Sequence, residues 1–222
     1  MGKTLITKNQ EEFLKFFASE QTLSKSFYFT GGTALSKFYL QHRISEDLDF
    51  FSLEEFKPQD ITVYIRKAKK TLKFNKFDYQ QSFNRNIYQL IFSNNKFLKV
   101  EFTYFPFPQI EKPKIVEGIP VDSLVDITVN KVFTISQNPR GRDFFDLFVI
   151  FKKTGWDIFD MIKKSRIKFD WNIDMFQFGS QLVKVNKLKD DPIIRNSKFN
   201  MEDVINYFLD FAKKIGKDVV KE

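Results

Sequence analysis

Two short patterns in the first quarter of the chain combine residue types that bind phosphate groups and metal ions. Gly31-Gly32 lies between a strand-like run and a helical pattern. Such a turn lets the backbone approach a ligand closely, and a helix start offers unpaired N–H groups to an anion. Asp47 and Asp49 are two residues apart on a predicted strand, so both carboxylates face the same way.

Two like charges held this close need a neutralising cation. Mg²⁺ suits the site because it takes one or two carboxylates together with substrate phosphates. The glycine turn and the paired aspartates therefore predict a metal–nucleotide site. Each pattern alone has an ordinary interpretation: a Gly-Gly pair is usually a turn, and Asp-x-Asp is common at solvated strand edges. Their order, with fourteen residues between Gly32 and Asp47, is more specific.

The composition excludes several other chemistries. The chain of 222 residues has no cysteine, which excludes disulfides, thiolate metal sites and cysteine nucleophiles. Its one histidine, His42, cannot build a multi-histidine zinc site, and we do not nominate it as a base. No apolar run reaches the roughly 18–20 residues of a membrane helix. The N-terminus lacks the apolar run of a secretion signal, so we expect a cytoplasmic protein.

The elements that position these residues are predicted from periodicity and turn signals. In the N-terminal half, helical patterns cover residues 11–20, 33–41 and 59–72. Strand patterns cover residues 26–30, 47–52, 74–83, 86–92 and 97–105. Four prolines then fall within residues 106–120, and helical patterns follow at 123–136, 142–153, 156–164, 171–185 and 201–215. We predict an α+β fold with a sheet domain at 1–118 and a helical domain at 119–222.

Positive charge gathers in the middle of the chain. Of the formal net charge of +8, residues 61–120 contribute most, with eleven basic against four acidic groups. A lysine-rich solvated surface is one interpretation, and a surface for polyanions is the other. The predicted helix at 59–72 and the residue after it carry a candidate track for an RNA backbone. Its residues are Arg66, Lys67, Lys69, Lys70 and Lys73.

The segment GGTALSKFYLQHRISEDLDFF resembles the signature of the AbiEii/AbiGii nucleotidyltransferase toxin family, a branch of the DNA polymerase β-like nucleotidyltransferases. The resemblance implies a mixed sheet flanked by helices, followed by a helical domain. It also implies transfer of a nucleotide from an NTP with Mg²⁺ or Mn²⁺, to an RNA such as the end of a tRNA or to a protein hydroxyl. Family members are typically the toxins of toxin–antitoxin or phage-defence pairs, so a cognate antitoxin is an implied partner.

The family pattern assigns roles to individual positions. Asp47 and Asp49 match the metal-binding aspartates. Gly31, Gly32 and the amide of Thr33 match the turn that cradles phosphate, and Arg43 and Ser45 match positions before the acidic strand that contact nucleotide. A looser likeness in the C-terminal half covers Lys131 and the stretch from Arg142 to Leu147, in which the resemblance implies that Arg142 and Asp146 contact nucleotide.

A third carboxylate is expected on a later strand, where Glu101 is the candidate. In residues 99–105, Val100, Phe102 and Tyr104 face inward and Glu101 faces the opposite way. The alternative is an exposed strand glutamate paired with Lys99 or Arg85.

Lys131 and Asp146 stand out because each interrupts an apolar helix face. A lysine on such a face must extend its amine to water or pair with an anion. The resemblance suggests that the anion is the triphosphate, so that Lys131 would offset charge on the leaving pyrophosphate. Asp146 needs a partner, and Arg142 lies at i−4 on the same face. An Arg142–Asp146 or Lys131–Asp146 clamp between two helices is the structural alternative, and it is compatible with nucleotide contact.

The leading hypothesis is therefore a magnesium-dependent nucleotidyltransferase in which Asp47, Asp49 and Glu101 bind metal and activate the acceptor. The alternative is a catalytically inactive module that binds nucleotide or RNA and acts by sequestration or through an antitoxin partner.

Overall fold

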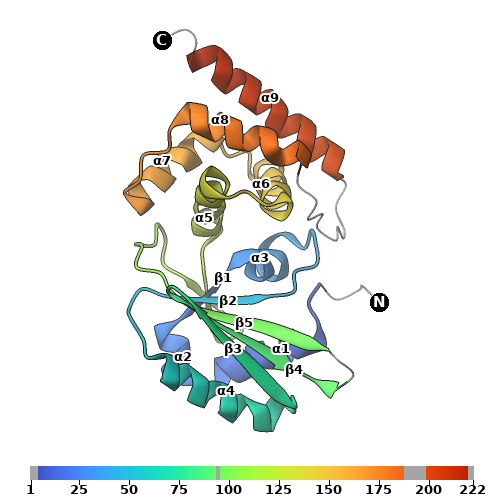
Figure 1. The fold of residues 1–222 in the computed structure, drawn as a ribbon, viewed down its shortest axis with the longest axis vertical. Helices are drawn as coiled ribbons and strands as arrows, with labels where there is room; N and C mark the ends of the chain where they lie inside the picture. Colours follow the sequence, from blue (N-terminus) through green and yellow to red (C-terminus); the bar gives the residue numbers. More distant parts are fainter. Residues whose placement is uncertain (1–4, 94–95, 188–198, 220–222) are drawn as a thin grey trace. The chain divides into compact units, whose positions relative to one another are not determined.

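The computed structural model describes residues 5–93, 96–187 and 199–219, which form two compact units (Figure 1). Unit 1 comprises residues 1–39 and 45–123, and unit 2 comprises residues 40–44 and 124–222. The sequence places the division between residues 118 and 119, whereas the last strand of the sheet ends at Val121. The short segment at 40–44 belongs to unit 2 although both of its flanks belong to unit 1.

Within the described residues, unit 1 contains a seven-stranded sheet in the order β3-β4-β5-β2-β1-β7-β6. Its strands are β1 Tyr28–Thr30, β2 Leu48–Ser52, β3 Lys76–Ser82, β4 Arg85–Ile91, β5 Phe97–Tyr104, β6 Lys114–Val116 and β7 Ile119–Val121. The pairs β2–β5 and β1–β7 are parallel, and the other neighbours are antiparallel. This mixed sheet, with its flanking helices and the helices of unit 2, confirms the predicted fold class.

One face of the sheet is covered by helices α1 Lys8–Ser19, α2 Gln21–Ser26 and α4 Pro58–Leu72 (Figure 1). Phe50 of β2 is fully buried there, with ring centroids 4.3 Å from Phe17 of α1 and 5.2 Å from Phe102 of β5. Side chains alternate between the faces of a strand. Because Phe50 and Phe102 face α1 and α4, their neighbours Asp49 and Glu101 lie on the opposite face.

The glycine turn follows β1 directly. Helix α3, Gly31–Ala34, begins at the first glycine and continues as a π-helix over Leu35–Leu40. Gly31 has φ of +76°, a backbone conformation that L residues rarely adopt. The helix therefore starts two residues earlier than the periodicity predicts, because the first glycine makes the turn at the end of the strand.

Unit 2 is helical in the part of the chain that the structure describes. Its helices are α5 Leu124–Gln137, α6 Gly141–Thr154, α7 Ile158–Phe169, α8 Met175–Val183, a 3-10 helix Lys184–Lys187 and α9 Met201–Val219. Helix α6 is buried on nearly every side, with Phe144, Phe145 and Leu147 fully inaccessible. No helix among the described residues is both long enough and apolar enough to cross a bilayer.

Candidate active site

Three carboxylates, here called the acid cluster, lie together in unit 1: Asp47, Asp49 and Glu101. Asp49 of β2 is directly opposite Glu101 of β5 in the parallel register, and Asp47 immediately precedes β2. Partner residues in neighbouring strands point to the same face. The structure therefore brings the predicted third carboxylate to the aspartate pair.

Two basic side chains, Arg85 and Lys99, pair with the acid cluster. Arg85 of β4 donates from Nε and Nη2 to both carboxylate oxygens of Glu101, each at 2.6 Å. Lys99 Nζ lies 2.9 Å from Asp47 Oδ2 and 3.9 Å from Glu101 Oε2. The pKa of Arg85 is raised above its ordinary value by its hydrogen bond to Glu101 and by the charges of the acid cluster. The pairing weighed as the alternative for Glu101 is thus present, but this glutamate is buried, not exposed.

The glycine turn and the loop before β2 hold the two aspartates. Gly31 lacks a side chain where one would collide with Asp49: an added Cβ would overlap Oδ2 and lie 3.1 Å from Cγ. The Thr33 hydroxyl donates to the backbone carbonyl of Asp47. Gln10 of α1 donates to the carbonyls of Ser45 and Glu46, at 2.9 and 3.0 Å. These contacts hold the backbone of residues 45–47, the segment that leads into β2.

The donor chemistry of the acid cluster suits a hard divalent cation. The ammonium of Lys99 already places a positive charge between Asp47 and Glu101, which shows that this spacing accommodates a cation. In its present arrangement, the described part of the chain holds no group of three or more His, Asp or Glu side chains spaced to bind a metal ion. Metal binding by Glu101 therefore needs Arg85 and Lys99 to give up some of their contacts.

A second set of charges, here called the buried ion cluster, lies in unit 2. Its buried members are His42, Arg43, Lys131, Asp143 and Asp146, and Arg140, whose side chain is 46% exposed, joins it from the surface. Asp146 is fully buried on α6 and accepts from Arg43 Nε at 2.6 Å and from Arg43 Nη2 at 2.8 Å. Lys131 Nζ is 2.6 Å from the same carboxylate. Burial alone would raise the pKa of Asp146, but Arg43 and Lys131 hold it well below its usual range.

Lys131 of α5 is shared between two carboxylates. Its Nζ donates to Asp143 Oδ1 at 2.9 Å, and Arg140 reaches the same carboxylate at 2.6 and 3.1 Å. Burial would raise the pKa of Asp143 as well, but Lys131 and Arg140 lower it below its ordinary value. The predicted Lys131–Asp146 clamp between two helices is therefore present. Lys131, at 7% exposure, already has anionic partners of its own.

The predicted pairing of Arg142 with Asp146 is not among the ion pairs of the described residues. Arg142 is half-buried on α6. Arg43 takes its place, because the segment 40–44 brings a planar guanidinium against both oxygens of Asp146, the fork geometry that guanidinium favours.

His42 is a member of the buried ion cluster that the sequence did not nominate. Its Nε2 is 2.6 Å from Asp146 Oδ1, and its ring stacks on Phe145. Its buried Nδ1 has no hydrogen-bond partner among the residues that the structure describes. Burial lowers its pKa despite the contact with Asp146. A neutral ring with the proton on Nε2 explains both nitrogens, because the bare Nδ1 then has no proton to donate.

Asp143 and Arg140 were also missed. The sequence did contain a signal for Asp143, because it lies three residues before Asp146 and therefore shares a helix face with it.

Comparison with known proteins places the chain among nucleotidyltransferases. The family described as nucleotidyl transferase AbiEii toxin, type IV TA system, matches residues 13–205. An uncharacterized protein of Aquifex aeolicus (strain VF5), aq_aa25, is 32% identical over 184 residues, covering 80% of this chain and 82% of that protein.

Two solved structures from Helicobacter pylori share the fold. A putative nucleotidyltransferase has a TM-score of 0.62 at 20% identity, covering 96% of this chain and 94% of that one. JHP933 has a TM-score of 0.57 at 19% identity, covering 97% and 95%.

Proposed function

This chain belongs to the AbiEii family of nucleotidyl transferase toxins of type IV toxin–antitoxin systems, and we propose that it moves a nucleotide from an NTP to the hydroxyl of an RNA acceptor. The end of a tRNA is the acceptor we favour, and a protein hydroxyl is the other. The observation that carries the proposal is the register of Asp49 against Glu101 beside Gly31. This arrangement supports a site in which Asp47, Asp49 and Glu101 act together on the triphosphate and the acceptor hydroxyl.

The residues of unit 1 supply the chemistry in this proposal. The acceptor oxygen attacks the α-phosphorus, the bond to the bridging oxygen breaks, pyrophosphate leaves, and the hydroxyl proton passes to a carboxylate of the acid cluster. Asp47 and Asp49 would hold Mg²⁺ or Mn²⁺, which would supply charge neutralisation at the triphosphate. Glu101 contributes a further metal contact or accepts the proton. Gly31 leaves room for Asp49, and the backbone from Gly31 to Thr33 receives phosphate.

Unit 2 supplies rigidity through the buried ion cluster. Arg43 and Asp146 tie the segment 40–44 to α6, and this segment joins the glycine turn to Asp47 along the chain. Contact of Lys131, Arg142 or Asp146 with nucleotide, and of Arg43 or Ser45 with phosphate, stays a prediction.

Transfer is tested with radiolabelled NTPs, Mg²⁺ and unfractionated tRNA. We expect wild-type protein to label the RNA and Asp49→Asn to lose at least a hundredfold of that activity. Glu55→Gln, which alters an exposed acid of the same unit, serves as the matched control and keeps wild-type activity. Equal labelling by wild type and Asp49→Asn would contradict the proposal.

A binding module without turnover is the second candidate, and one contact favours it: Arg85 occupies both oxygens of Glu101. Such a module would act by sequestering nucleotide or RNA, or through the antitoxin partner that the type IV family suggests. It predicts that Glu101→Gln leaves cellular toxicity intact. Transferase chemistry predicts that the same substitution abolishes toxicity while the protein remains folded.

A further inference from the structure

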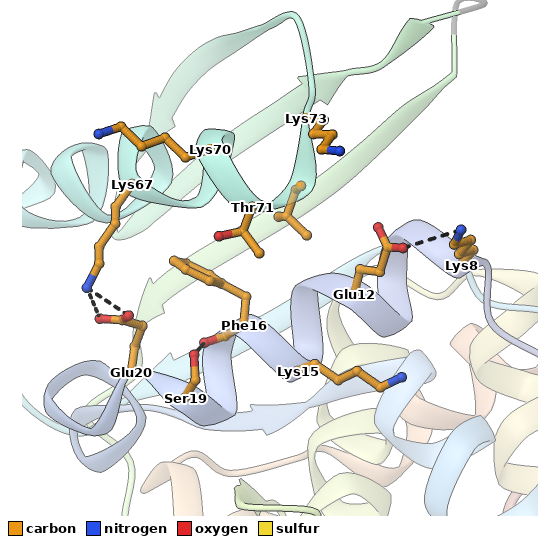
Figure 2. A pocket seen from close by; sticks show the side chains of 11 residues that line it. Lys8, Glu12, Lys15, Phe16, Ser19, Glu20, Lys67, Lys70, Thr71 and Lys73 are labelled. Atoms are coloured by element: carbon orange, nitrogen blue, oxygen red, sulfur yellow. Dashed lines mark hydrogen bonds and ion pairs between the residues drawn. The ribbon is translucent and has the colours of Figure 1, made fainter.

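A groove lies on the surface of unit 1 between α1 and α4, with a volume of about 890 Å³ (Figure 2). Lysines line both of its walls. Lys8 and Lys15 come from α1, and Lys67, Lys70 and Lys73 come from α4 and the residue that ends it. We call it the lysine groove. The sequence marked only the α4 lysines as a track for RNA, and the second wall comes from the packing of two helices.

The lysine groove has an excess of positive charge. Its two acids, Glu12 and Glu20, pair with Lys8 at 3.6 Å and with Lys67 at 2.8 Å. Within the described residues, Lys70 and Lys73 have no ion pair. Lys15 pairs with Glu11, just outside the lining, at 3.1 Å, so Lys70 and Lys73 supply the two positive charges that no carboxylate of the described residues balances. A polyanion neutralises them and releases its own counterions, which favours binding.

The walls of the groove are rigid. The Phe16 ring at its floor is 7% exposed and lies 5.2 Å from the ring of Tyr64, which joins α1 to α4. Below this contact, Phe13 and Ile65 are fully buried against the sheet. The lysine stems therefore start from fixed positions. A helix of twelve residues such as α1 is about 18 Å long, which is enough to lie along several consecutive phosphates.

The lining fits a nucleic acid better than a protein. Lysine, glutamate and serine are depleted at protein–protein interfaces, which are anchored by exposed aromatic residues and arginine. Here lysine dominates, and the apolar residues of the lining, Phe16 and Leu72, are buried in the floor. Flexible ammonium groups suit phosphates of no fixed sequence.

We propose that the lysine groove binds the phosphate backbone of the RNA acceptor, away from the reacting end. This inference rests on the proposed transfer to RNA. The groove is on the α1–α4 face of the sheet, and the acid cluster is on the other face, so only an RNA long enough to pass around the sheet reaches both. A tRNA has that length, and a trinucleotide does not. The groove then sets the affinity for long acceptors and leaves the transfer step unaffected.

The test compares the full chain carrying Lys15→Gln, Lys70→Gln and Lys73→Gln with a control carrying Lys25→Gln, Lys112→Gln and Lys114→Gln. Both variants lose three exposed charges from unit 1, and only the first loses them from the groove. Fluorescence anisotropy with 5′-fluorescein-labelled unfractionated tRNA gives the Kd over a range of salt concentrations. Each phosphate contact on a single strand is worth about 0.7 log units per tenfold change in salt. We expect the groove variant to bind roughly 100-fold more weakly at 0.1 M salt and to lose about 2 from its salt slope. The control stays near wild type.

Transfer assays separate this inference from the proposed function. We expect the groove variant to show a raised KM for tRNA, an unchanged kcat, and wild-type transfer to a trinucleotide, the pattern of lost uniform binding. If the groove and control variants bind tRNA equally, the inference fails even when wild type is an active transferase. If wild type binds tRNA through the groove but transfers nothing, the proposed function fails instead. Tighter binding of poly-glutamate than of tRNA at the groove would overturn the RNA assignment in favour of an acidic protein partner.

Discussion

Asp146→Asn should have a large effect on the stability of unit 2. Asp146 is fully buried and accepts from Arg43, Lys131 and His42. An asparagine there removes the negative charge and turns an N–H group toward at least one of these donors. Leaving one side of a buried ion pair without its partner costs about 3–5 kcal/mol. Arg43 carries most of that cost, because Lys131 keeps Asp143 as a partner.

The measurement must report on unit 2 alone, because a chain of two units need not unfold in one step. Both tryptophans of the chain, Trp156 and Trp171, belong to unit 2, so intrinsic fluorescence follows that unit during a urea titration. A loss of about 4 kcal/mol at an m-value of about 2 kcal/mol/M lowers the midpoint by roughly 2 M. Asp160→Asn, at an exposed acid on α7, is the matched control and should shift it little.

A double variant identifies the cause of the loss. When Arg43→Met is combined with Asp146→Asn, the unpaired guanidinium is gone, so the two changes together should cost less than the sum of the single changes. A free energy of unfolding for Asp146→Asn within about 1 kcal/mol of the wild-type value would refute the reasoning, and so would strict additivity of the pair.

Three further outcomes follow from the same contacts. Burial lowers the pKa of His42, so near pH 6.5 the unfolded state binds a proton that the folded state does not bind. The free energy of unfolding of unit 2 should therefore fall as the pH drops below about 6.5. Urea titrations at several pH values should show this slope in wild type and not in His42→Asn. Gly31→Ala should cost about 1–2 kcal/mol for its positive φ and, in addition, displace the carboxylate of Asp49. Gly155 shares the positive φ, but a Cβ there would meet no atom of the described residues within 4 Å, so Gly155→Ala should show the backbone cost alone in thermal melts. Lys99→Met removes an ammonium from between two carboxylates, so calorimetric titration with Mn²⁺ should show binding at least tenfold tighter than in wild type; weaker binding would mean that the lysine helps to hold the site.

The local pattern was enough to predict the elements around the acid cluster. The alternation of Leu48, Asp49 and Phe50 predicted a strand with its aspartate facing away from the core, and the structure has β2 there. The same logic predicted the strand of Glu101. These predictions succeed because the faces of a strand are set by residues one and two positions apart, which the sequence displays directly.

Distant pairings were harder to predict. The predicted pairing of Lys131 with Asp146 is present. The predicted pairing of Arg142, four residues from Asp146, was wrong. The arginine that pairs with Asp146 is Arg43, which is 103 residues away in sequence. Helical spacing identifies neighbours on one element only. The environment of His42 was missed for the same reason, since the sequence does not show that this loop histidine packs against Phe145 and Asp146 of α6.

The sequence by itself determined the family, the fold class, and the order of the glycine turn and acidic residues, because each depends on residue types at short, fixed spacings. Only the tertiary structure decided that Glu101 faces Asp49, that Arg85 and Lys99 bind these acids, and that α1 and α4 combine their lysines around one groove. Those facts depend on strand register and on which helix faces pack together. Both are set by burial of the apolar core across the whole chain, a long-range balance that no local pattern contains.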